Sequence, residues 1–588
     1  MDSKHVTEST SGQEDIQKTW WKEAIIYQIY PRSFQDSDGD GIGDLNGITS
    51  RLDYIQSLGV DIIWLNPIFL SPNDDNGYDI SDYREIMREF GTMEDFDRLL
   101  KEIHKREMRL VLDLVVNHTS DEHPWFEEAR KSRHNPYYNY YHWWPAEKGE
   151  PPLRLSYFDE EGNAWMYNKP TDSYYLHYFS RKQPDLNWEN PEVRQEIFDM
   201  MRFWFDKGID GFRMDSISLI AKDPSFPLID SKKYPDIFSF YAKEPRLHLY
   251  LHEMNRQVLS KYDCMSVGEG SAVMVDDVAK FVDPAREELN MLYHFDAARI
   301  RNTTLPDNPE SGIDYSLIAL KKMFTEWDKA VDKGWPSIYL GNHDQPRMVS
   351  RFGSDKDEFR ALSAKMLITF LLTMKGTPYW FAGDEIGMRN IRFDRIEDYN
   401  DIDTINRYKK AKAEGKDPQA VLDEQKETGR DNARTPFQWD RSPEAGFTAG
   451  TPWFKVNPDY TWINVADEEK DPTSILNYFK KVVSFRKENP SLIYGSYHLL
   501  DAENPQSYTF LRKTGADTYL IMLNFSPKAA ISTPGIDMSN AHVLLDNYGD
   551  RSHMAPQKDI TLRPFEAIVF QLNHPVYESF IDSLDLLE

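Results

Sequence analysis

The feature that most constrains this chain is a long alternation of short apolar runs with amphipathic helical segments. Eight runs have the composition of strands, and they cover residues 25–30, 61–65, 109–116, 210–214, 264–268, 290–295, 337–341 and 377–381. Strands that alternate with helices pair in parallel, because each helix returns the chain to the same end of the sheet. Eight such units predict an α/β fold, a (β/α)8 TIM barrel. A doubly wound open sheet is the alternative, but the count of eight and a long insert after the third strand favour the barrel.

The helical segments carry their own start and stop signals. Thr92 is followed three residues later by Asp95, a variant of the capping box that opens a helix. Pro191 suits the first turn of a later helix, and Gly208 is placed to end it. These signals predict helices that begin near Thr92 and Pro191 and connect consecutive strands.

Changes in composition divide the chain into segments. Residues 1–18 are polar, and we expect a disordered tail there. We expect the barrel to occupy residues 19–116 and 183–499. Residues 117–182 form a loop-rich insert, called subdomain B below, whose run YYNYYHWW is expected to build a small core of its own. A hairpin pattern around TGAD and a further strand pattern predict a C-terminal antiparallel β-sandwich over residues 500–588.

The balance of charge narrows the class of partner. The chain has 69 basic and 97 acidic residues and a net charge of −28, which repels nucleic acid and anionic lipid. A neutral or cationic small molecule is therefore the favoured partner. The sequence shows no membrane-spanning apolar run and no secretory signal, and its one cysteine, Cys264, excludes a disulfide within the chain. We therefore expect a cytoplasmic protein that is monomeric or weakly homo-oligomeric.

Acidic side chains stand at the carboxyl ends of several predicted strands. Asp113 lies near the end of the third strand, and Asp215, Glu269 and Asp344 follow the fourth, fifth and seventh. Active sites of TIM barrels are built at this end, so the last three are expected to converge. A single one of them is better explained as part of a buried ion pair, but three at strand ends indicate a catalytic site.

The spacing within GFRMD suggests different protonation states for two of these carboxyls. Arg213 and Asp215 lie on the same side of the strand, so the cation is expected to lower the pKa of Asp215 and keep it ionised. Glu269 follows the apolar run MSV, and a drier setting is expected to raise its pKa. An ionised and a protonated carboxyl about 5 Å apart are what retaining glycoside hydrolysis requires.

Four short motifs carry a resemblance that covers nearly the whole chain. DLVVNH, GFRMD, GE after the fifth strand and NHD resemble the four signature regions of the α-amylase family of glycoside hydrolases. QPDLNW, GYDI and GRDNARTPFQW are similar to the branch that contains oligo-1,6-glucosidases, maltases and sucrose isomerases. The resemblance implies that Asp215 is the nucleophile, Glu269 the general acid/base and Asp344 the residue that stabilises the transition state, with Arg213 beside the nucleophile.

The resemblance also implies a pocket shaped around one glucose unit. Asp79 and Arg430 would pair and close its floor, which makes the enzyme exo-acting because no chain can pass through. The other implied substrate contacts are His118 and His343 to sugar hydroxyls, Tyr78 and Phe179 by stacking, and Gln183. Ordinary core packing remains the alternative for the two stacking residues.

The run DSDGDGIGD, residues 36–44, has the spacing of a loop that binds a hard cation. The expected ligands are Asp36, Asp38, Asp40, the carbonyl of Ile42, and Asp44. The Glu that closes an EF-hand loop is replaced by Gly47, and a phosphate loop is disfavoured because the aspartates would repel phosphate. The same loop occurs in the resembled branch as a structural calcium site. We therefore expect Ca²⁺ ahead of Mg²⁺, with an unmetallated turn as the alternative, and no organic cofactor.

Three positions bear on the leaving group. Ser216 follows the nucleophile, where members of the branch that cut α-1,6 bonds tend to carry Val and the α-1,4 or sucrose-active ones Thr or Ala. A small polar residue favours the second group. Asp403 stands where the branch usually has a Glu that contacts the +1 sugar. The arginine-rich RLDRD-like run of sucrose isomerases is matched by RNTTL from Arg301, so only the first Arg is kept.

These observations favour a retaining, exo-acting α-glucosidase that acts on short α-glucosides of the maltose, isomaltose or sucrose type. A sucrose isomerase or transglucosylase that uses the same glucosyl-enzyme is the alternative. A non-catalytic relative of glycosidases is disfavoured, because all three carboxylates are present.

Overall fold

Eight parallel strands form one sheet in the computed structural model, which describes residues 18–158, 162–515, 517–552 and 558–572. Most of the expected N-terminal tail lies outside the described residues. The strands are β1 (Ile26–Ile29), β2 (Ile62–Leu65), β5 (Arg109–Val115), β9 (Gly211–Asp215), β10 (Met265–Glu269), β11 (Met291–Tyr293), β12 (Ser337–Ile338) and β13 (Thr377–Phe381). Each falls within or one residue beyond a run that the sequence predicts.

The sheet closes on itself as a barrel. Its strands follow chain order from β1 to β11, while β13 pairs with β1 and β12 pairs with β13. Between β11 and β12 the contact is made by side chains, since the Ser337 hydroxyl donates to the Leu292 carbonyl at 2.7 Å and the Tyr339 hydroxyl to the His294 carbonyl. The predicted TIM barrel is confirmed, and the doubly wound alternative is wrong.

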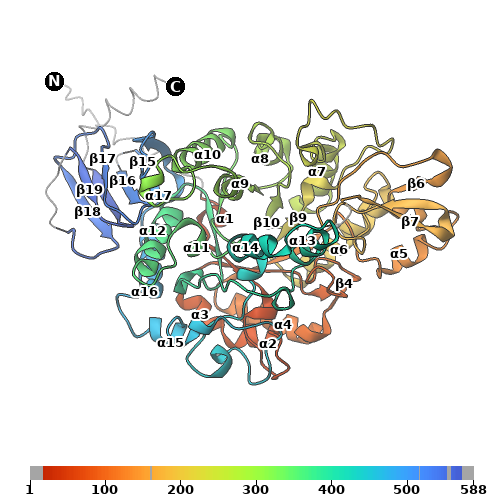
Figure 1. Ribbon diagram of the computed structural model, residues 1–588, viewed down its shortest axis with the longest axis horizontal. Helices are drawn as coiled ribbons and strands as arrows, with labels where there is room; N and C mark the ends of the chain where they lie inside the picture. The colour runs from red at the N-terminus through yellow and green to blue at the C-terminus, as the bar shows by residue number, and fades with distance from the viewer. Residues whose placement is uncertain (1–17, 159–161, 516, 553–557, 573–588) are drawn as a thin grey trace, which may run out of the picture.

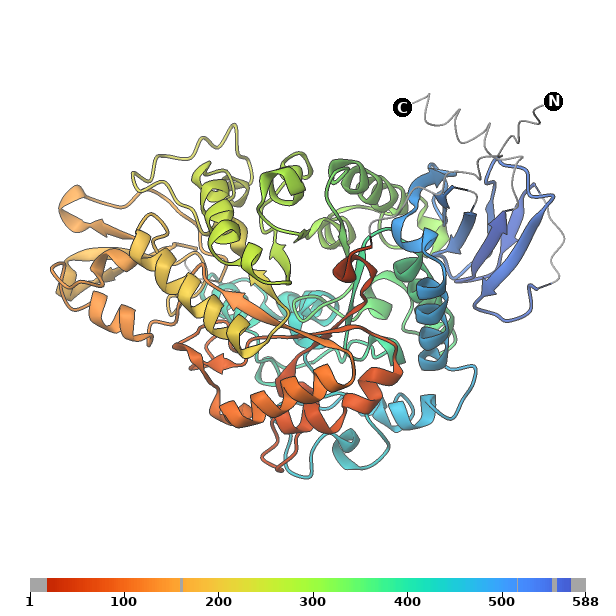
Figure 2. The same ribbon diagram turned by 180° about the vertical axis from the view of Figure 1, so that it is seen from behind.

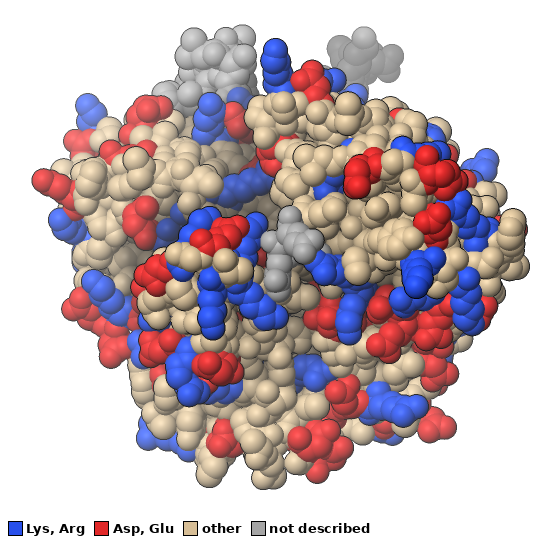
Figure 3. Space-filling view, turned by 45° about the vertical axis from the view of Figure 1, so that its right-hand side comes forward, with Lys and Arg blue, Asp and Glu red and all other residues tan. Residues whose placement is uncertain are grey.

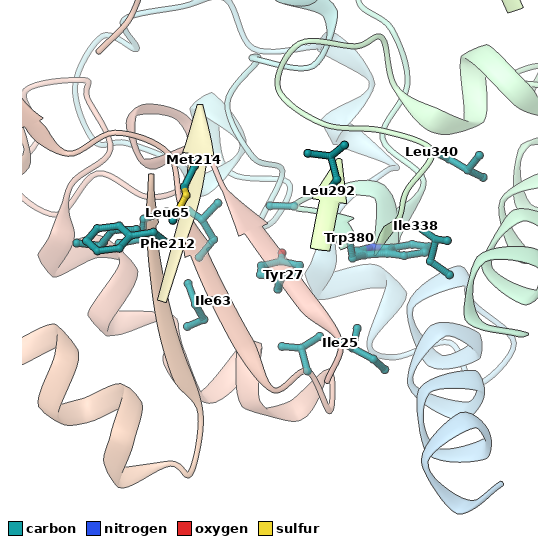
Figure 4. Close-up of a cluster of buried hydrophobic side chains, with 14 of the residues drawn as sticks. Ile25, Tyr27, Ile63, Leu65, Phe212, Met214, Leu292, Ile338, Leu340 and Trp380 are labelled. Atoms are coloured by element: carbon teal, nitrogen blue, oxygen red, sulfur yellow. The ribbon is translucent and has the colours of Figure 1, made fainter. Parts of the chain in front are cut away.

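Both faces of the barrel strands are buried, which explains their nearly continuous apolar composition. In β2, Ile62 and Trp64 belong to the cluster inside the barrel, while Ile63 and Leu65 join the larger cluster that packs against the helices. Figure 4 shows part of this outer cluster, to which β1, β2 and β9 contribute alternate residues. The alternation positions every second side chain of a strand inside the barrel, where its carboxyl end can build a site.

Helices surround the barrel (Figures 1 and 2) and begin where the sequence signals them. Thr92 and Asp95 form a complete capping box at α4, and Gly208 ends α6 with a φ of 108°. The main helices are α2 (Leu45–Ser50), α3 (Leu52–Ser57), α4 (Met93–Lys105), α6 (Pro191–Lys207), α7 (Arg246–Gln257), α9 (Asp296–Thr303), α10 (Leu317–Ala330), α12 (Arg360–Thr373) and α16 (Ile475–Glu488). None of the described helices combines the length and the apolar character that crossing a membrane requires.

Subdomain B projects from the barrel at the side opposite the C-terminal domain (Figure 1). It contains α5 (Pro124–Ala129) and a three-stranded antiparallel sheet of β6 (Trp143–Pro145), β8 (Ser173–Leu176) and β7 (Trp165–Asn168). Trp143 stacks on Tyr138, with ring centroids 4.9 Å apart, and on Phe126 of α5. The expectation that the aromatic run builds a core of its own is wrong, because Tyr140 and Tyr141 belong to the main core of the barrel and Trp143 packs against it.

A second insertion follows β13, and the sequence pattern did not separate it from the barrel. It contains α13 (Ile402–Ala413) and α14 (Pro418–Thr428). The chain then reaches the carboxyl ends of the strands, where Arg430 donates to Asp344 at 3.1 Å. This insertion therefore contributes to the same end of the barrel as subdomain B.

The C-terminal part is an antiparallel β domain, as predicted. A five-stranded sheet has the order β14 (Ser496–Leu500), β15 (Ser507–Thr514), β16 (Asp517–Asn524), β20 (Ala567–Leu572) and β18 (Ala541–Asp546), and β17 (Ala530–Ser532) pairs with β19 (Ile560–Leu562). The expected hairpin joins β15 to β16, with Thr514 opposite Asp517.

On the molecular face in Figure 3, basic side chains are interspersed with acidic ones.

Candidate active site

The carboxyl ends of β5, β9 and β10 gather three acidic side chains around one arginine. Arg213 Nη1 donates to Asp113 at 2.8 Å and to Asp215 at 2.9 Å, and its Nη2 donates to Glu269. Arg213 and Asp215 lie on the same side of β9, as their spacing predicts. The structure therefore brings Asp215 and Glu269 onto the two ends of a single guanidinium group.

Arg213 is a fixed part of this arrangement. It is 1% exposed, and its guanidinium carbon lies 5.2 Å from the centre of the Trp64 ring. Burial acts to lower the pKa of Arg213, but Asp113, Glu269 and Asp215 raise it well above its usual value. The cation therefore stays charged and orients the carboxyls that surround it.

Burial governs the protonation of Asp215 and Glu269. It raises the pKa of Asp215 to about 6, although Arg213 opposes the rise. It raises the pKa of Glu269 to about 7, again against Arg213. Arg213 does act to lower the pKa of Asp215, as expected, but the expected net lowering is wrong, because the cost of desolvating this carboxylate exceeds the attraction of a cation that it shares. The expected order holds, since Glu269 keeps its proton to a higher pH than Asp215.

Asp215 and Glu269 are neighbours, since each contacts one amino nitrogen of the Arg213 guanidinium. Adjacent carboxyls are the arrangement of retaining glycoside hydrolases, whereas inverting ones hold the two groups about 6.5–9.5 Å apart with a water molecule between them. The adjacent arrangement suits a double displacement, in which one carboxylate attacks a carbon atom while its protonated neighbour supplies a proton to the leaving oxygen.

Asp344 is held ionised from three directions. Its carboxylate lies 3.0 Å from His343 Nε2, 3.1 Å from Arg430 Nη1 and 3.0 Å from Arg434 Nη2. Burial acts to raise the pKa of Asp344, but the hydrogen bond from His343 and the charges of Arg430 and Arg434 hold it well below its usual range. Sequence reasoning missed Arg434, although it follows Arg430 by four residues in the same motif.

The two predicted histidines are buried and neutral. Burial lowers the pKa of His118 to about 3, and it lowers that of His343 as well. The Nε2 of His118 lies 3.2 Å from the Gln183 amide, and the Nε2 of His343 lies 2.8 Å from the Tyr78 hydroxyl. The Tyr78 ring also stacks on His343 at 5.3 Å, so Tyr78 is packed into the wall of the site.

The predicted pairing of Asp79 with Arg430 is wrong. Asp79 is 0% exposed, and its carboxylate accepts hydrogen bonds from the Asp74 and Asp75 amides and the Ser71 hydroxyl. It therefore caps the turn that precedes it, in the loop between β3 (Phe69–Leu70) and β4 (Asp82–Ile86). The acid that faces Arg430 is Asp75.

Asp75 and Arg430 form an ion pair beside Asp344. An oxygen of Asp75 lies 3.6 Å from Arg430 Nη2, and its other oxygen accepts from Gln183 at 3.2 Å. Arg430 also donates to Asp401, the N-cap of α13. The loop carries Asp74, Asp75 and Asp79 within six residues, and nothing in their order shows which one turns inward.

Aromatic rings line one side of the site. Phe179 packs against His118 with ring centroids 5.1 Å apart, and it stacks on Tyr157 at 5.1 Å. Phe158, which sequence reasoning missed, lies 4.9 Å under the Arg430 guanidinium. Its carbonyl accepts from Asn406 of α13 at 2.7 Å, so subdomain B and the second insertion meet here.

Ser216, Asp403 and Arg301, which are expected to bear on the leaving group, differ in their burial and in their contacts. Ser216 is 3% exposed and adopts a left-handed conformation with φ 43°. Asp403 is half-buried in the first turn of α13, where burial raises its pKa to about 6. Arg301 is turned away, since it donates to Asp314 and to the Arg351 carbonyl at 2.7 Å.

The acidic loop of residues 36–44 lies away from these groups. Carboxylate oxygens of Asp36, Asp38 and Asp40 lie within 4.8 Å of one another. The Asp44 carboxylate is not part of this cluster, because it caps α2 by accepting from Gly47 at 2.7 Å and also accepts from Ser37. The Ile42 amide donates to Asp40 at 2.8 Å, which folds the loop tightly.

Comparison with known proteins places the whole barrel in one family. Residues 28–495 match the family model of the alpha amylase catalytic domain. The chain is 51% identical over 571 residues to an oligo-1,6-glucosidase of Parageobacillus thermoglucosidasius, and the match covers 95% of this chain and 100% of that protein.

Solved structures also resemble this chain over nearly its whole length. A mutant of MutB described in complex with the substrate sucrose is 42% identical with a TM-score of 0.89, covering 94% of this chain and 99% of that one. The isomaltulose synthase SmuA of Protaminobacter rubrum is 42% identical with a TM-score of 0.89, covering 95% of this chain and 100% of that one.

Proposed function

Because the chain belongs to the α-amylase family of glycoside hydrolases, we propose that it is a retaining, exo-acting α-glucosidase that hydrolyses short α-glucosides. The observation that carries the proposal is the pair of carboxyls, Asp215 and Glu269, on one buried guanidinium with pKa values of about 6 and about 7. Between about pH 6 and about pH 7, Asp215 is ionised and Glu269 is protonated.

The proposed mechanism has two displacements. Asp215 attacks the anomeric carbon of the bound glucose unit, while Glu269 gives its proton to the departing glycosidic oxygen. A glucosyl ester on Asp215 results, and the aglycone leaves as an alcohol. Glu269, now ionised, takes a proton from water, whose oxygen displaces Asp215 and releases glucose. Asp344, which stays ionised, stabilises the positive charge that develops on the sugar ring.

A closed floor supports exo action. Arg430 joins Asp344 to Asp75 across the site, with nitrogen–oxygen distances of 3.1 and 3.6 Å. A pocket closed in this way holds one terminal glucose unit and directs its non-reducing end inward. The neutral rings of His118 and His343 and the aromatic face of Phe179 supply sugar contacts without excess charge.

Hydrolysis is favoured over isomerisation. The structural relatives include a protein described with sucrose and an isomaltulose synthase, so sucrose is a reasonable substrate. An isomerase must hold the released fructose, however, and Arg301 is bound by Asp314 and the Arg351 carbonyl. We propose that sucrose, maltose and isomaltose all give free glucose.

We also propose a structural Ca²⁺ ion at the loop of residues 36–44. Asp36, Asp38 and Asp40 offer three hard oxygen ligands close together. Burial raises the pKa of Asp40, and repulsion from the neighbouring aspartates raises it further. A divalent ion would relieve that repulsion and brace the loop after β1. Asp44, whose carboxylate also caps α2, and the carbonyl of Ile42 complete the proposed ligand set.

The remaining proposals concern the setting of the enzyme. We propose that it acts in the cytoplasm on neutral sugars, as a monomer or weak homo-oligomer, and without nucleic acid or membrane partners. The net charge of −28 supports the exclusion of polyanions. Cell fractionation and light scattering test the location and the assembly.

Separate incubation with sucrose, maltose and isomaltose tests the function. We expect glucose from each substrate, with fructose as the second product from sucrose. Isomaltulose or trehalulose as the main product from sucrose would establish the isomerase alternative. No reaction with any of the three would contradict the proposal.

A further inference from the structure

Ser271, two residues after Glu269, makes a contact that the proposed mechanism does not yet use. Its hydroxyl donates to Glu269 Oε1 at 2.8 Å, while Arg213 Nη2 donates to the other oxygen, Oε2. The two carboxyl oxygens of Glu269 therefore have different hydrogen-bond partners, which come from different parts of the barrel. Arg213 belongs to β9, whereas Ser271 lies in the turn that follows β10.

Ser271 is itself held in place. Its carbonyl accepts from the Ser218 hydroxyl at 2.6 Å, and Ser218 is fully buried in the 3₁₀ turn that begins at Ile217. That turn comes directly after Asp215 and Ser216. Hydrogen bonds therefore connect the turn behind Asp215 to Ser271, and Ser271 to Glu269.

We propose that Ser271 is a positioning residue for Glu269, whose hydroxyl holds Oε1 and so fixes the orientation in which this carboxyl delivers its proton. The inference rests on the proposed role of Glu269 as acid/base. Arg213 can only donate hydrogen bonds, so it disfavours a proton on Oε2. A serine hydroxyl both donates and accepts, so Ser271 can pair with Oε1 whether or not this oxygen carries the proton.

Removal of the hydroxyl has a defined effect on proton affinity. A hydrogen bond to an ionised carboxylate is stronger than one to the neutral acid, so its loss disfavours the ionised form and raises the pKa of Glu269. The other titratable or charged groups that face Glu269 are Arg213 and Asp215 from β9, Asp113 from β5, Asp344 after β12, Tyr339 near β12, and Tyr157 from subdomain B. Replacement of Ser271 leaves all of them in place.

The test compares Ser271→Ala with wild type and with Ser266→Ala. Ser266 lies on β10, the strand that carries Glu269, and its hydroxyl contacts Asn290 at 3.2 Å rather than Glu269. Ser266→Ala is therefore a matched control for the loss of a serine hydroxyl. The basic limb of kcat/KM reports loss of the catalytic proton in the free enzyme. For Ser271→Ala we expect this limb to move up by about 0.5–1 pH unit, in line with the loss of one hydrogen bond to a charged group.

Leaving-group dependence gives a second readout. Maltose needs a full proton transfer to its departing oxygen, whereas p-nitrophenyl α-glucoside departs with little help. We expect Ser271→Ala to lose more kcat/KM on maltose than on the aryl glucoside. Ser271→Thr, which keeps the hydroxyl, should restore the wild-type limb, and Ser271→Gly should reproduce the shift of Ser271→Ala.

Each outcome decides a separate question. A Ser271→Ala profile that superimposes on wild type, with equal losses on both substrates, overturns the inference, and so does an identical shift in Ser266→Ala. Activity on maltose that survives Glu269→Gln overturns the acid/base role of Glu269 in the proposed mechanism, on which this inference rests. An inactive Glu269→Gln enzyme together with a silent Ser271→Ala change overturns the positioning role alone.

Discussion

Replacement of Asp75 and of Asp79 should give opposite phenotypes, although the two residues are four positions apart in one loop. Asp75 faces Arg430 at 3.6 Å and is bound by Gln183, whereas Asp79 accepts hydrogen bonds from the Asp74 and Asp75 amides and from Ser71. In the proposed function, the contact between Asp75 and Arg430 forms the floor of the pocket. The second holds the loop in shape.

The structure sets the size of both effects. Asp75→Ala removes a buried polar partner of the bound glucose unit and should lower kcat/KM by about 10²–10³-fold, the loss of roughly 3–4 kcal/mol of polar contact. Asp79→Ala removes three hydrogen bonds to a buried carboxyl, each worth about 1.5 kcal/mol. The free energy of local opening around Asp74 and Asp75 should therefore fall by roughly 3–5 kcal/mol.

Two assays separate the variants. Steady-state kinetics on maltose measures the floor, and amide hydrogen exchange of residues 71–79 measures the turn. Asp75→Ala should lose activity with protection intact, whereas Asp79→Ala should exchange its loop amides at least about 10²-fold faster. Asp74→Ala is a control from the same loop, because the Asp74 side chain contacts Ser180 and not Arg430. Near-wild-type activity of Asp75→Ala, with an inactive Asp79→Ala whose loop stays protected, would refute the assignment.

Three further predictions follow from the site. The dependence of activity on pH, measured with maltose, should be bell-shaped. Activity is lost below about pH 6 because Asp215 gains a proton, and above about pH 7 because Glu269 loses its proton. A flat profile from pH 5 to 9 would contradict these roles. Ser216→Val should shift substrate preference from maltose toward isomaltose by about ten-fold, roughly 1.4 kcal/mol. It should also lower the melting temperature, because a β-branched residue resists a φ of 43°. A wild-type enzyme that already prefers isomaltose would refute the argument from Ser216. Excess EDTA should lower the melting temperature with little change in turnover at low temperature, and an unchanged melting curve with no metal by elemental analysis would exclude Ca²⁺.

Much of the fold follows from patterns that are local in sequence. All eight barrel strands lie where apolar runs predict them, because strands buried on both faces are apolar throughout. The caps at Thr92 and Gly208 depend on neighbours a few residues away, so they can also be read directly. The second insertion was missed because α13 and α14 follow the last strand, β13, where the closing helix of a barrel is expected.

The site was predictable where strand position decides it. Asp215 and Glu269 meet because TIM-barrel strands end at one rim, and the motifs mark which strands those are. The partner of Arg430 was not predictable, since Asp75 and Asp79 differ only in how a loop folds. The pKa of Asp215 was misjudged for a related reason, because its sign depends on how deeply the carboxylate is buried and on how many acids share Arg213.

The central claim is that Asp215 forms a covalent bond to glucose. A 5-fluoro-α-glucosyl fluoride should glycosylate the enzyme rapidly and hydrolyse slowly, because the fluorine destabilises both transition states while the good leaving group preserves the first step. Mass spectrometry of peptides from the trapped enzyme should then find one fluoroglucosyl group on Asp215. No covalent adduct despite turnover, or an adduct on Glu269 or Asp344 instead, would contradict the account.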